Sequence, residues 1–135
     1  MDRMTPQQRS YNMSRIRSKN TRPELTVRKM VHRMGFRYRL HQKNLPGKPD
    51  LVLRRHKKVI LVHGCFWHGH TCENGRSTPE NNRNYWIAKR KYNKKRDRLN
   101  ERKLIKDGWR VLVLWECETE NQNVLRRKLE NFLKT

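Results

Sequence analysis

Acidic residues are scarce in this chain of 135 residues: 12 Asp plus Glu stand against 34 Lys plus Arg, for a formal net charge of +22. A chain this basic repels itself strongly unless a polyanion is its working partner, so we expect it to act on a nucleic acid. It is not short of core-forming residues, because 33% are hydrophobic and four are Trp. The composition therefore favours a folded basic enzyme or binding domain over a disordered basic tail.

Long apolar runs are absent as well. No stretch approaches the ~20 apolar residues of a membrane span, and the first ten residues, MDRMTPQQRS, lack the apolar region of a secretory signal. We therefore expect a cytoplasmic, nucleoid-associated protein with no membrane contact. The length suits a single domain over residues 1–135, with residues 1–20 as an N-terminal arm or helix that contacts DNA.

Cysteine is also rare, and the odd count of three argues against a disulfide framework and leaves metal binding or free thiols. Cys65, His70 and Cys72 lie in one short segment, and Cys117 follows an apolar run that ends at Trp115. A Cys3His set suits tetrahedral structural zinc, which would tie the segment to a distant strand end. The alternative is three buried apolar cysteines beside an unrelated surface histidine. The segment has few aliphatic residues with which to order itself, which favours the metal.

The spacing of apolar residues predicts the element order α-β-β-β-α-β-α. Thr21, Pro23 and Glu24 are typical of a capped helix start, and Gly35 of its end. The remaining predicted elements are a strand over 36–40, a hairpin of 50–53 with 59–63, a long basic helix over 80–107, a strand over 109–115 and a last helix capped by Thr119 with Gln122. Apolar contacts of the long helix are expected from Trp86, Ile87, Leu99, Leu104 and Ile105, and Trp109 and Trp115 are expected in the core.

A candidate catalytic group lies where the hairpin strands begin and end. Asp50 opens one strand after Gly-Lys-Pro, and the partner strand ends at His63. Phosphodiester hydrolysis needs a hard cation on oxygen ligands and a group that manages the proton of the attacking water. If His70 binds zinc, His63 and His68 remain for proton transfer. His32, His41 and His56 have no partner motif, and we interpret them as solvated residues without a role.

Structural alternatives exist for each of these residues. A Pro-Asp pair also serves in ordinary turns. His63 could simply end a strand, and His68 could be an outer or alternative zinc ligand.

Residues 62–72 (VHGCFWHGHTC), preceded by residues 45–50 (LPGKPD), strongly resemble the very-short-patch mismatch repair endonucleases. Further matching positions cover nearly the whole chain: Asn12-Met13, Thr21 to Glu24, Trp86, Arg96-Asp97, Leu104 to Val113 and Trp115 to Cys117. The resemblance implies a restriction-endonuclease-like α/β fold, a central mixed β-sheet flanked by helices with a structural zinc site. It also implies a Mg2+-dependent DNA endonuclease that nicks one strand 5′ of the thymine in a T·G mismatch, which starts very-short-patch repair.

The resemblance also implies roles for individual residues. Asp50 would hold magnesium together with the backbone carbonyl of Val62. His68 would be the general base, His63 an active-site partner, and Glu24 a support for the catalytic histidine. Zinc would be held by Cys65, His70, Cys72 and Cys117. Phe66, Trp67 and Trp86 would intercalate into DNA next to the mismatch, and Met13 would insert from the minor-groove side.

One departure concerns the wider nuclease superfamily, whose second acidic residue and lysine are absent: the strand after Asp50 ends in Leu61-Val62-His63. The repair family shares that absence, but often has Thr where this chain has Val62. A competing interpretation is a non-catalytic, zinc-stabilised DNA-binding module. Asp50 argues against it, because a carboxylate there would repel phosphate unless a cation were bound. Only the resemblance excludes an RNA-directed nuclease. We expect a monomer that binds double-stranded DNA with a T·G mismatch, with mismatch-repair proteins as further candidate partners.

Overall fold

A computed structural model describes residues 21–76 and 78–135. The predicted arm of residues 1–20, with Met13, lies outside the described residues. Within the described part the chain forms a mixed four-stranded sheet in the order β1 (Arg39–Leu40), β2 (Leu51–Leu53), β3 (Lys58–His63) and β4 (Arg110–Trp115). The first three strands pair antiparallel, and β4 pairs parallel to β3. The predicted hairpin and the predicted element order are confirmed, with short helical segments added between them.

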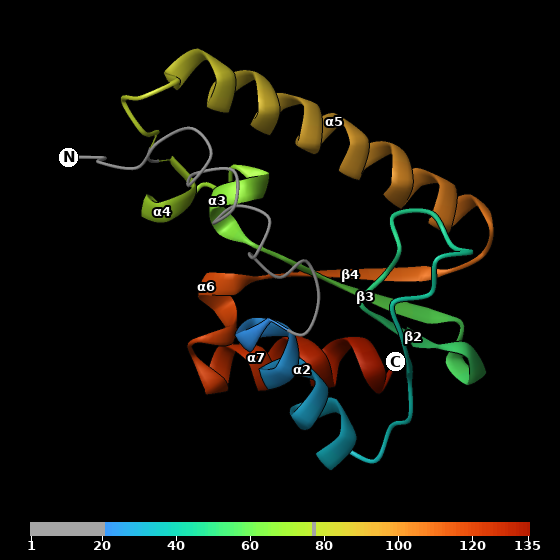
Figure 1. The fold of residues 1–135 in the computed structure, drawn as a ribbon. Coiled ribbons are helices and arrows are strands. Elements are labelled where there is room, and N and C mark those ends of the chain that lie inside the picture. The colour runs from blue at the N-terminus through green and yellow to red at the C-terminus, as the bar shows by residue number, and fades with distance from the viewer. Residues whose placement is uncertain (1–20, 77) are drawn as a thin grey trace.

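Helices lie on both faces of this sheet (Figure 1). The long helix α5 (Arg83–Lys106) covers one face, and α2 (Arg22–Arg33) and α7 (Gln122–Leu133) cover the other. Side chains alternate along β3, so Ile60 contributes to the α2 and α7 side, while Val59 and Leu61 contribute to the α5 side. In the described part of the chain, no helix is long and apolar enough to cross a membrane.

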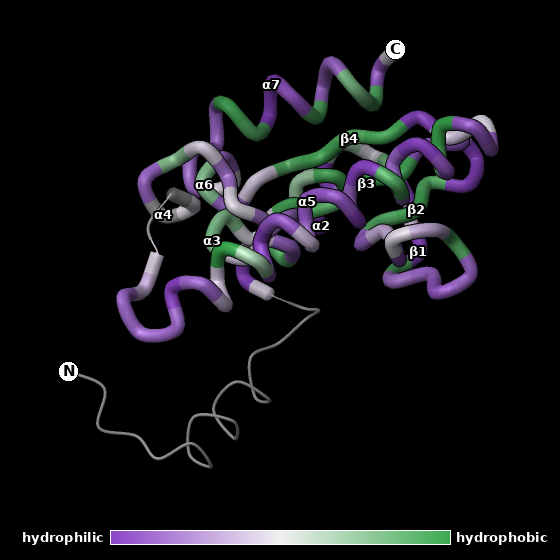
Figure 2. Tube along the Cα trace, turned by 90° about the horizontal axis from the view of Figure 1, so that it is seen from above, coloured by the Kyte–Doolittle hydropathy of each residue, from purple (hydrophilic) through white to green (hydrophobic). Residues whose placement is uncertain are grey.

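The apolar cores on the two faces differ in size. Nine buried residues form the core under α2 and α7: Val27, Val31, Leu51, Leu53, Ile60, Leu114, Leu125, Leu129 and Leu133. Four form the core under α5: Val52, Val59, Leu61 and Leu104. Figure 2 shows the amphipathic pattern of α7, whose hydrophobic and hydrophilic residues alternate along the helix.

The helix ends test the predicted caps. Thr21 caps α2 as predicted, its Oγ1 accepting a hydrogen bond from the Glu24 backbone N–H at 3.5 Å. The predicted Thr119 cap of α7 is wrong, because the Asn121 side chain accepts from the backbone N–H groups of Asn123 and Val124. Thr119 instead belongs to a separate turn, α6 (Glu116–Thr119), and donates to the Glu116 carbonyl at 2.6 Å.

The predicted apolar contacts of α5 are mostly wrong. Ile87, Leu99 and Ile105 are 48%, 47% and 61% exposed, whereas Leu104 is fully buried as expected. The side of α5 that faces the protein is partly polar, with Arg90 and Asn93 buried there. Hydrogen bonds to a neighbouring segment replace apolar packing at these positions, and a pattern of hydrophobicity cannot reveal them.

The parallel pairing of β3 and β4 defines one edge of the sheet. The register places His63 opposite Trp115, so both strands end at the same level. Asp50 directly precedes β2, which runs antiparallel and therefore begins at this edge. We call Asp50, His63, Trp115 and the segments 64–76 and 116–119 the site edge. It includes the one-turn helices α3 (Cys65–His68) and α4 (Glu73–Arg76), which lie with α6 at one end of the molecule (Figure 1).

Candidate active site

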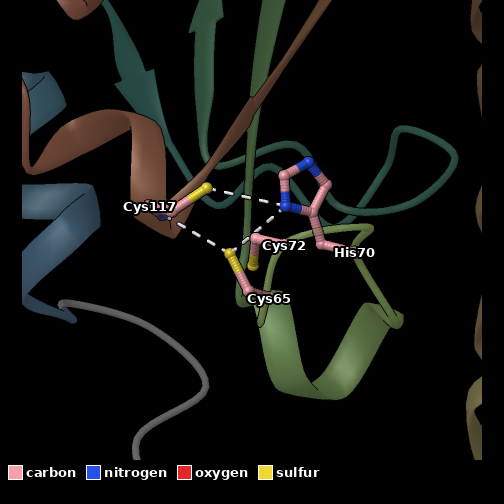
Figure 3. Close-up of side chains that lie close together, drawn as sticks. All are labelled: Cys65, His70, Cys72 and Cys117. Carbon is pink, nitrogen blue, oxygen red and sulfur yellow. Dashed lines mark hydrogen bonds between the residues drawn. The ribbon is translucent and has the colours of Figure 1, made fainter. Parts of the chain in front are cut away.

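The predicted cysteine cluster, Cys65, His70, Cys72 and Cys117, converges at the site edge (Figure 3). The four ligand atoms lie within 4.8 Å of one another, and His70 Nδ1 is 3.7 Å from Cys65 Sγ and 3.5 Å from Cys117 Sγ. A tetrahedral zinc ion with ordinary Zn–S and Zn–N bonds separates S and N by about 3.6 Å. The donor set and its spacing therefore fit zinc.

The strand register explains why Cys65 meets Cys117. Each cysteine lies two residues beyond one of the paired strand ends, His63 and Trp115. The Cys117 backbone N–H donates to Cys65 Sγ at 3.4 Å, a contact that needs both strands to be in place. A parallel pair thus brings together two thiols that are far apart in the sequence.

Gly75 packs against the backbone of His70 beside the cysteine cluster, and the sequence did not mark it as a functional residue. A Cβ on this residue would lie 2.1 Å from the His70 carbonyl oxygen, so only glycine allows the approach. The hydrogen bond from its backbone lowers the pKa of Cys72 to about 7, with help from His70. Burial raises the pKa of Cys65 to about 12, so its ionisation needs the positive charge that a metal ion would provide.

A second group, the acidic centre, consists of Glu24, His41 and Asp50, whose ligand atoms also lie within 4.8 Å of one another. Asp50 Oδ2 accepts a hydrogen bond from the Val62 N–H at 2.7 Å. Burial and, to a smaller extent, the nearby Glu24 carboxylate raise the pKa of Asp50 to about 7. Two carboxylates held together away from water are the oxygen ligands that a hard cation prefers.

His41 is not the solvated residue that the sequence suggested. Its Nε2 lies 2.9 Å from Glu24 Oε1, and its backbone N–H donates to the Asp50 carbonyl at 3.2 Å. Its backbone is left-handed, with φ of +47°. Glu24, which is 1% exposed, also accepts from Arg28 at 3.1 Å. The structure thus places Glu24 beside Asp50, and the carboxylate paired with His68 is a different one.

That carboxylate is Asp97 of α5, which completes a histidine centre with His63 and His68. His68 Nδ1 lies 2.6 Å from Asp97 Oδ2. Burial alone would raise the pKa of Asp97, but the hydrogen bond and the charge of His68 bring it below its ordinary value. Asp97 had been noted only as a residue that matched the family. Its partner lies 29 positions away, so the pairing is visible only in the fold.

The rings of His63 and His68 stack at 4.0 Å with an interplanar angle of 3°. Burial, and next the charge of His68, lower the pKa of His63 to about 4. Its Nδ1 has no hydrogen-bond partner in the described part of the chain. His63 is therefore neutral at ordinary pH, and it presents an uncharged ring face to His68.

Trp115 was predicted as core, but it lies among the histidines. Its ring stacks on His70 at 4.2 Å and meets His63 edge-on at 5.2 Å. It therefore separates the cysteine cluster from the histidine centre with an apolar surface. Trp109, in contrast, packs against the core under α5 as predicted.

The chain is similar to known proteins over nearly its whole length. Residues 1–74 match the family model described as DNA mismatch endonuclease Vsr. The type II nicking enzyme V.XorIIP of Xanthomonas oryzae pv. oryzae is 47% identical over 132 residues, covering 98% of this chain and 96% of that protein. The DNA mismatch endonuclease Vsr of Escherichia coli is 35% identical over 130 residues, covering 93% and 83%. This chain belongs to the Vsr family of DNA mismatch endonucleases.

Membership of the Vsr family makes the chain a nuclease that acts on DNA. A further relative, the type II nicking enzyme V.NmeAIP of Neisseria meningitidis, is 44% identical over 133 residues, covering 98% of this chain and 94% of that protein. The residues that match the family model include Glu24, Asp50 and His68. Each of the three groups described above therefore has members in the matched part, and only Asp97 of α5 and Cys117 of α6 lie beyond it.

The Vsr-family chain also carries an aromatic cluster, formed by Phe66 and Trp67 of the site edge and by Trp86 of α5. The three rings meet edge-on, with centroids 5.1 to 5.5 Å apart. All three side chains are half-buried, and none belongs to either apolar core. The fold therefore brings together the three described residues for which the sequence predicted DNA insertion.

Proposed function

We propose that this Vsr-family chain nicks one strand of duplex DNA 5′ of the thymine in a T·G mismatch, in a Mg2+-dependent hydrolysis that starts very-short-patch repair. The observation that carries the proposal is the presence of an acidic centre and a histidine centre at the end of the same strand, β3. We also assign the fold to the restriction-endonuclease-like class. Its support is the mixed sheet with helices on both faces.

The acidic centre has the donor set for magnesium. Asp50 and the backbone carbonyl of Val62 would hold the ion, and Glu24 offers a further oxygen within the same group. When bound, Mg2+ would polarise the scissile phosphate and offset the negative charge that develops on it. The raised pKa of Asp50 supports this assignment, because a carboxylate that is buried beside a second carboxylate is strongly stabilised by a bound cation.

The histidine centre supplies the proton acceptor. Asp97 holds Nδ1 of His68, which leaves Nε2 to take the proton of the attacking water. The Asp97 carboxylate then stabilises the imidazolium that forms, and it fixes the ring orientation. His63 stays neutral beside it, so it adds no repulsion as His68 becomes charged.

The remaining groups hold the site and recognise the substrate. Cys65, His70, Cys72 and Cys117 would bind a structural zinc ion. The aromatic cluster would enter the duplex beside the mismatch, and Met13 would insert from the minor-groove side. A T·G wobble pair stacks poorly, so opening it costs less than opening an intact step.

Nicking of duplexes that differ at a single base pair tests the proposal directly. The purified chain is incubated with duplexes carrying a T·G, A·C or T·A pair at one position, in Mg2+ and in EDTA. We expect a single nick 5′ of the thymine in the T·G duplex, only with Mg2+. Equal cutting of all duplexes would refute the mismatch specificity, and cutting in EDTA would refute the metal requirement.

Asp50→Ala separates catalysis from binding. It removes a cation ligand and a negative charge that faces phosphate, so nicking should be lost while duplex affinity is kept or rises. Asp107→Ala, at the exposed end of α5, removes a carboxylate far from the site and should cut normally. An active Asp50→Ala enzyme would overturn the metal role.

Trp67→Ala tests recognition. We expect the variant to lose its preference for the T·G duplex while the salt dependence of binding stays nearly unchanged. Contacts to phosphates set that dependence, because the logarithm of the binding constant falls with the logarithm of the salt concentration with a slope of about −0.9 per neutralised phosphate. Neutralising the exposed Lys and Arg residues between 89 and 98, a set that leaves out the buried Arg90, should instead flatten the salt slope on both duplexes. Equal losses on both duplexes for Trp67→Ala would mean that this residue only packs the fold.

A further inference from the structure

Arg90 is a buried arginine that the chemistry proposed above does not use. It is 8% exposed, and its guanidinium lies 4.4 Å from the centroid of the Phe66 ring. Its Nε donates to the Phe66 carbonyl at 2.8 Å, and its Nη1 donates to Thr78 Oγ1 at 3.4 Å. Over residues 21–76 and 78–135, its Nη2 is buried and has no hydrogen-bond partner. Arg90 thus binds both the ring and the backbone of Phe66.

Arg90 is one of three α5 residues that hold consecutive residues of α3. Asn93 Nδ2 donates to the Trp67 carbonyl at 2.9 Å, and Asp97 pairs with His68. The spacing of 90, 93 and 97 places the three side chains on one face of α5. Because α3 is a single turn, it has few backbone donors for its last carbonyls. The Phe66 carbonyl accepts from the Gly69 backbone N–H at 3.4 Å as well as from Arg90, and the Trp67 carbonyl accepts from Asn93.

We propose that Arg90 is a positioning residue for mismatch recognition, which fixes Phe66 so that the aromatic cluster and His68 move as one body with α5. The inference rests on the proposed function, in which this cluster enters the duplex. Insertion into a base step is opposed by the cost of unstacking. A cluster that is already ordered does not add the cost of immobilising its own side chains at the same moment.

The alternative role for Arg90 is a charge that contacts a DNA phosphate. The burial of Nη2 and the use of Nε and Nη1 inside the protein favour positioning. The two roles separate on substitution by lysine. Lys keeps the charge, but one ammonium group cannot lie flat on a ring and also span a carbonyl and a hydroxyl.

The test compares full-length Arg90→Lys and Arg90→Gln with the unaltered chain. A 2-aminopurine base beside the T·G pair reports opening of the step in EDTA, and single-turnover nicking in Mg2+ gives the T·G over T·A ratio. Both variants should give a smaller fluorescence rise and reduce the T·G over T·A ratio by about three- to tenfold. Ordering one further side chain on binding changes the affinity by about that factor. The salt slope should not change. Lys91→Gln, the exposed neighbour, should weaken both duplexes alike.

A pre-opened substrate distinguishes positioning from general damage to the fold. A second mismatch next to the T·G pair removes most of the unstacking cost, so it should restore nicking by Arg90→Lys. If Arg90→Gln fails to fold, Arg90→Lys and Thr78→Val carry the test, the latter with a smaller loss in the same direction because it removes only the Nη1 contact.

Three results would overturn the inference. Arg90→Lys could nick at the normal rate with a normal fluorescence rise. The salt slope could fall in Arg90→Gln but not in Arg90→Lys, or the second mismatch could fail to restore nicking by Arg90→Lys. If the unaltered chain itself gives no fluorescence rise with T·G DNA, the proposed insertion fails. If it gives one that the Arg90 variants match, only the role of Arg90 fails.

Discussion

The two faces of the sheet are built differently. On the α2 and α7 face, nine buried apolar residues pack into one core. On the α5 face there are four. Beyond Leu104 towards the site edge, α5 makes hydrogen bonds from Arg90, Asn93 and Asp97, together with the edge-on ring contacts of Trp86. Apolar packing is strong but not directional, whereas hydrogen bonds fix distances and angles. The α2 and α7 face therefore supplies most of the stability, and the α5 face supplies the precision of the site.

The largest effect is expected at the cysteine cluster, which joins the segment of Cys65 to the segment of Cys117 at the site edge. Cys117→Ser should lose zinc and loosen residues 64–76, because structural zinc contributes about 10 to 16 kcal/mol of apparent binding free energy in small zinc domains. Zinc content and hydrogen exchange would measure this, with protection lost first at the site edge and kept longest near Leu125. A zinc-loaded, fully active Cys117→Ser protein would show that the cluster is misassigned.

Breaking the polar contacts of α5 should affect rate far more than stability. Asp97→Asn should slow single-turnover nicking by about 10²- to 10⁴-fold, the usual contribution of acid-base catalysis, since Asn cannot stabilise a charged His68. The free energy of unfolding should change little. Glu101→Gln, four residues further on the same helix, is the matched control and should keep most of the activity. A comparable loss in both variants would point to a general charge effect.

A substitution in the apolar core under α2 and α7 should affect stability far more than rate. Leu129→Ala removes a fully buried side chain and should lower the free energy of unfolding by about 2 to 5 kcal/mol, as measured by urea titration. Nicking per folded molecule should be unchanged. Ile105→Ala, at 61% exposed on α5, should cost less than about 0.5 kcal/mol. Similar losses at the two positions would refute the contrast between the faces.

A smaller loss of stability than at Leu129 is expected at Lys58, a buried charge on the α2 and α7 face. Its Nζ donates to the carbonyls of Phe132, Leu133 and Thr135, and burial lowers its pKa. Lys58→Met should cost about 1 to 3 kcal/mol, because the carbonyls at the end of α7 lose their donor. Urea unfolding would measure the loss, and nicking per folded molecule should be unchanged. A loss of rate at full stability would link this lysine to the site.

The sequence predicted the stable face better than the precise one. Two apolar runs on either side of a basic turn located β2 and β3, and therefore the positions of Asp50 and His63 at one edge. The Cys3His set identified the cysteine cluster before the register of β3 and β4 explained it. These features depend on local pattern or on residue type, which a single chain displays directly.

The misses share a physical cause. His41 is 17 positions from Glu24, and its contact depends on a left-handed backbone that no local signal marks. Asp97 and Arg90 lie in a helix whose charges look solvated until α3 is packed against it. Each of these side chains acquires its role from a partner in another element, so its function exists only in the tertiary structure.

The contact between Cys65 and Cys117 has a consequence for protein synthesis. The cluster joins residues 52 positions apart, and β3 has no parallel neighbour until β4 has been made. Contacts of such long sequence separation form late. On the ribosome, a chain that has not yet emerged past residue 117 therefore holds Asp50, His63 and His68 without the frame that aligns them, and such a nascent chain is expected to leave DNA uncut.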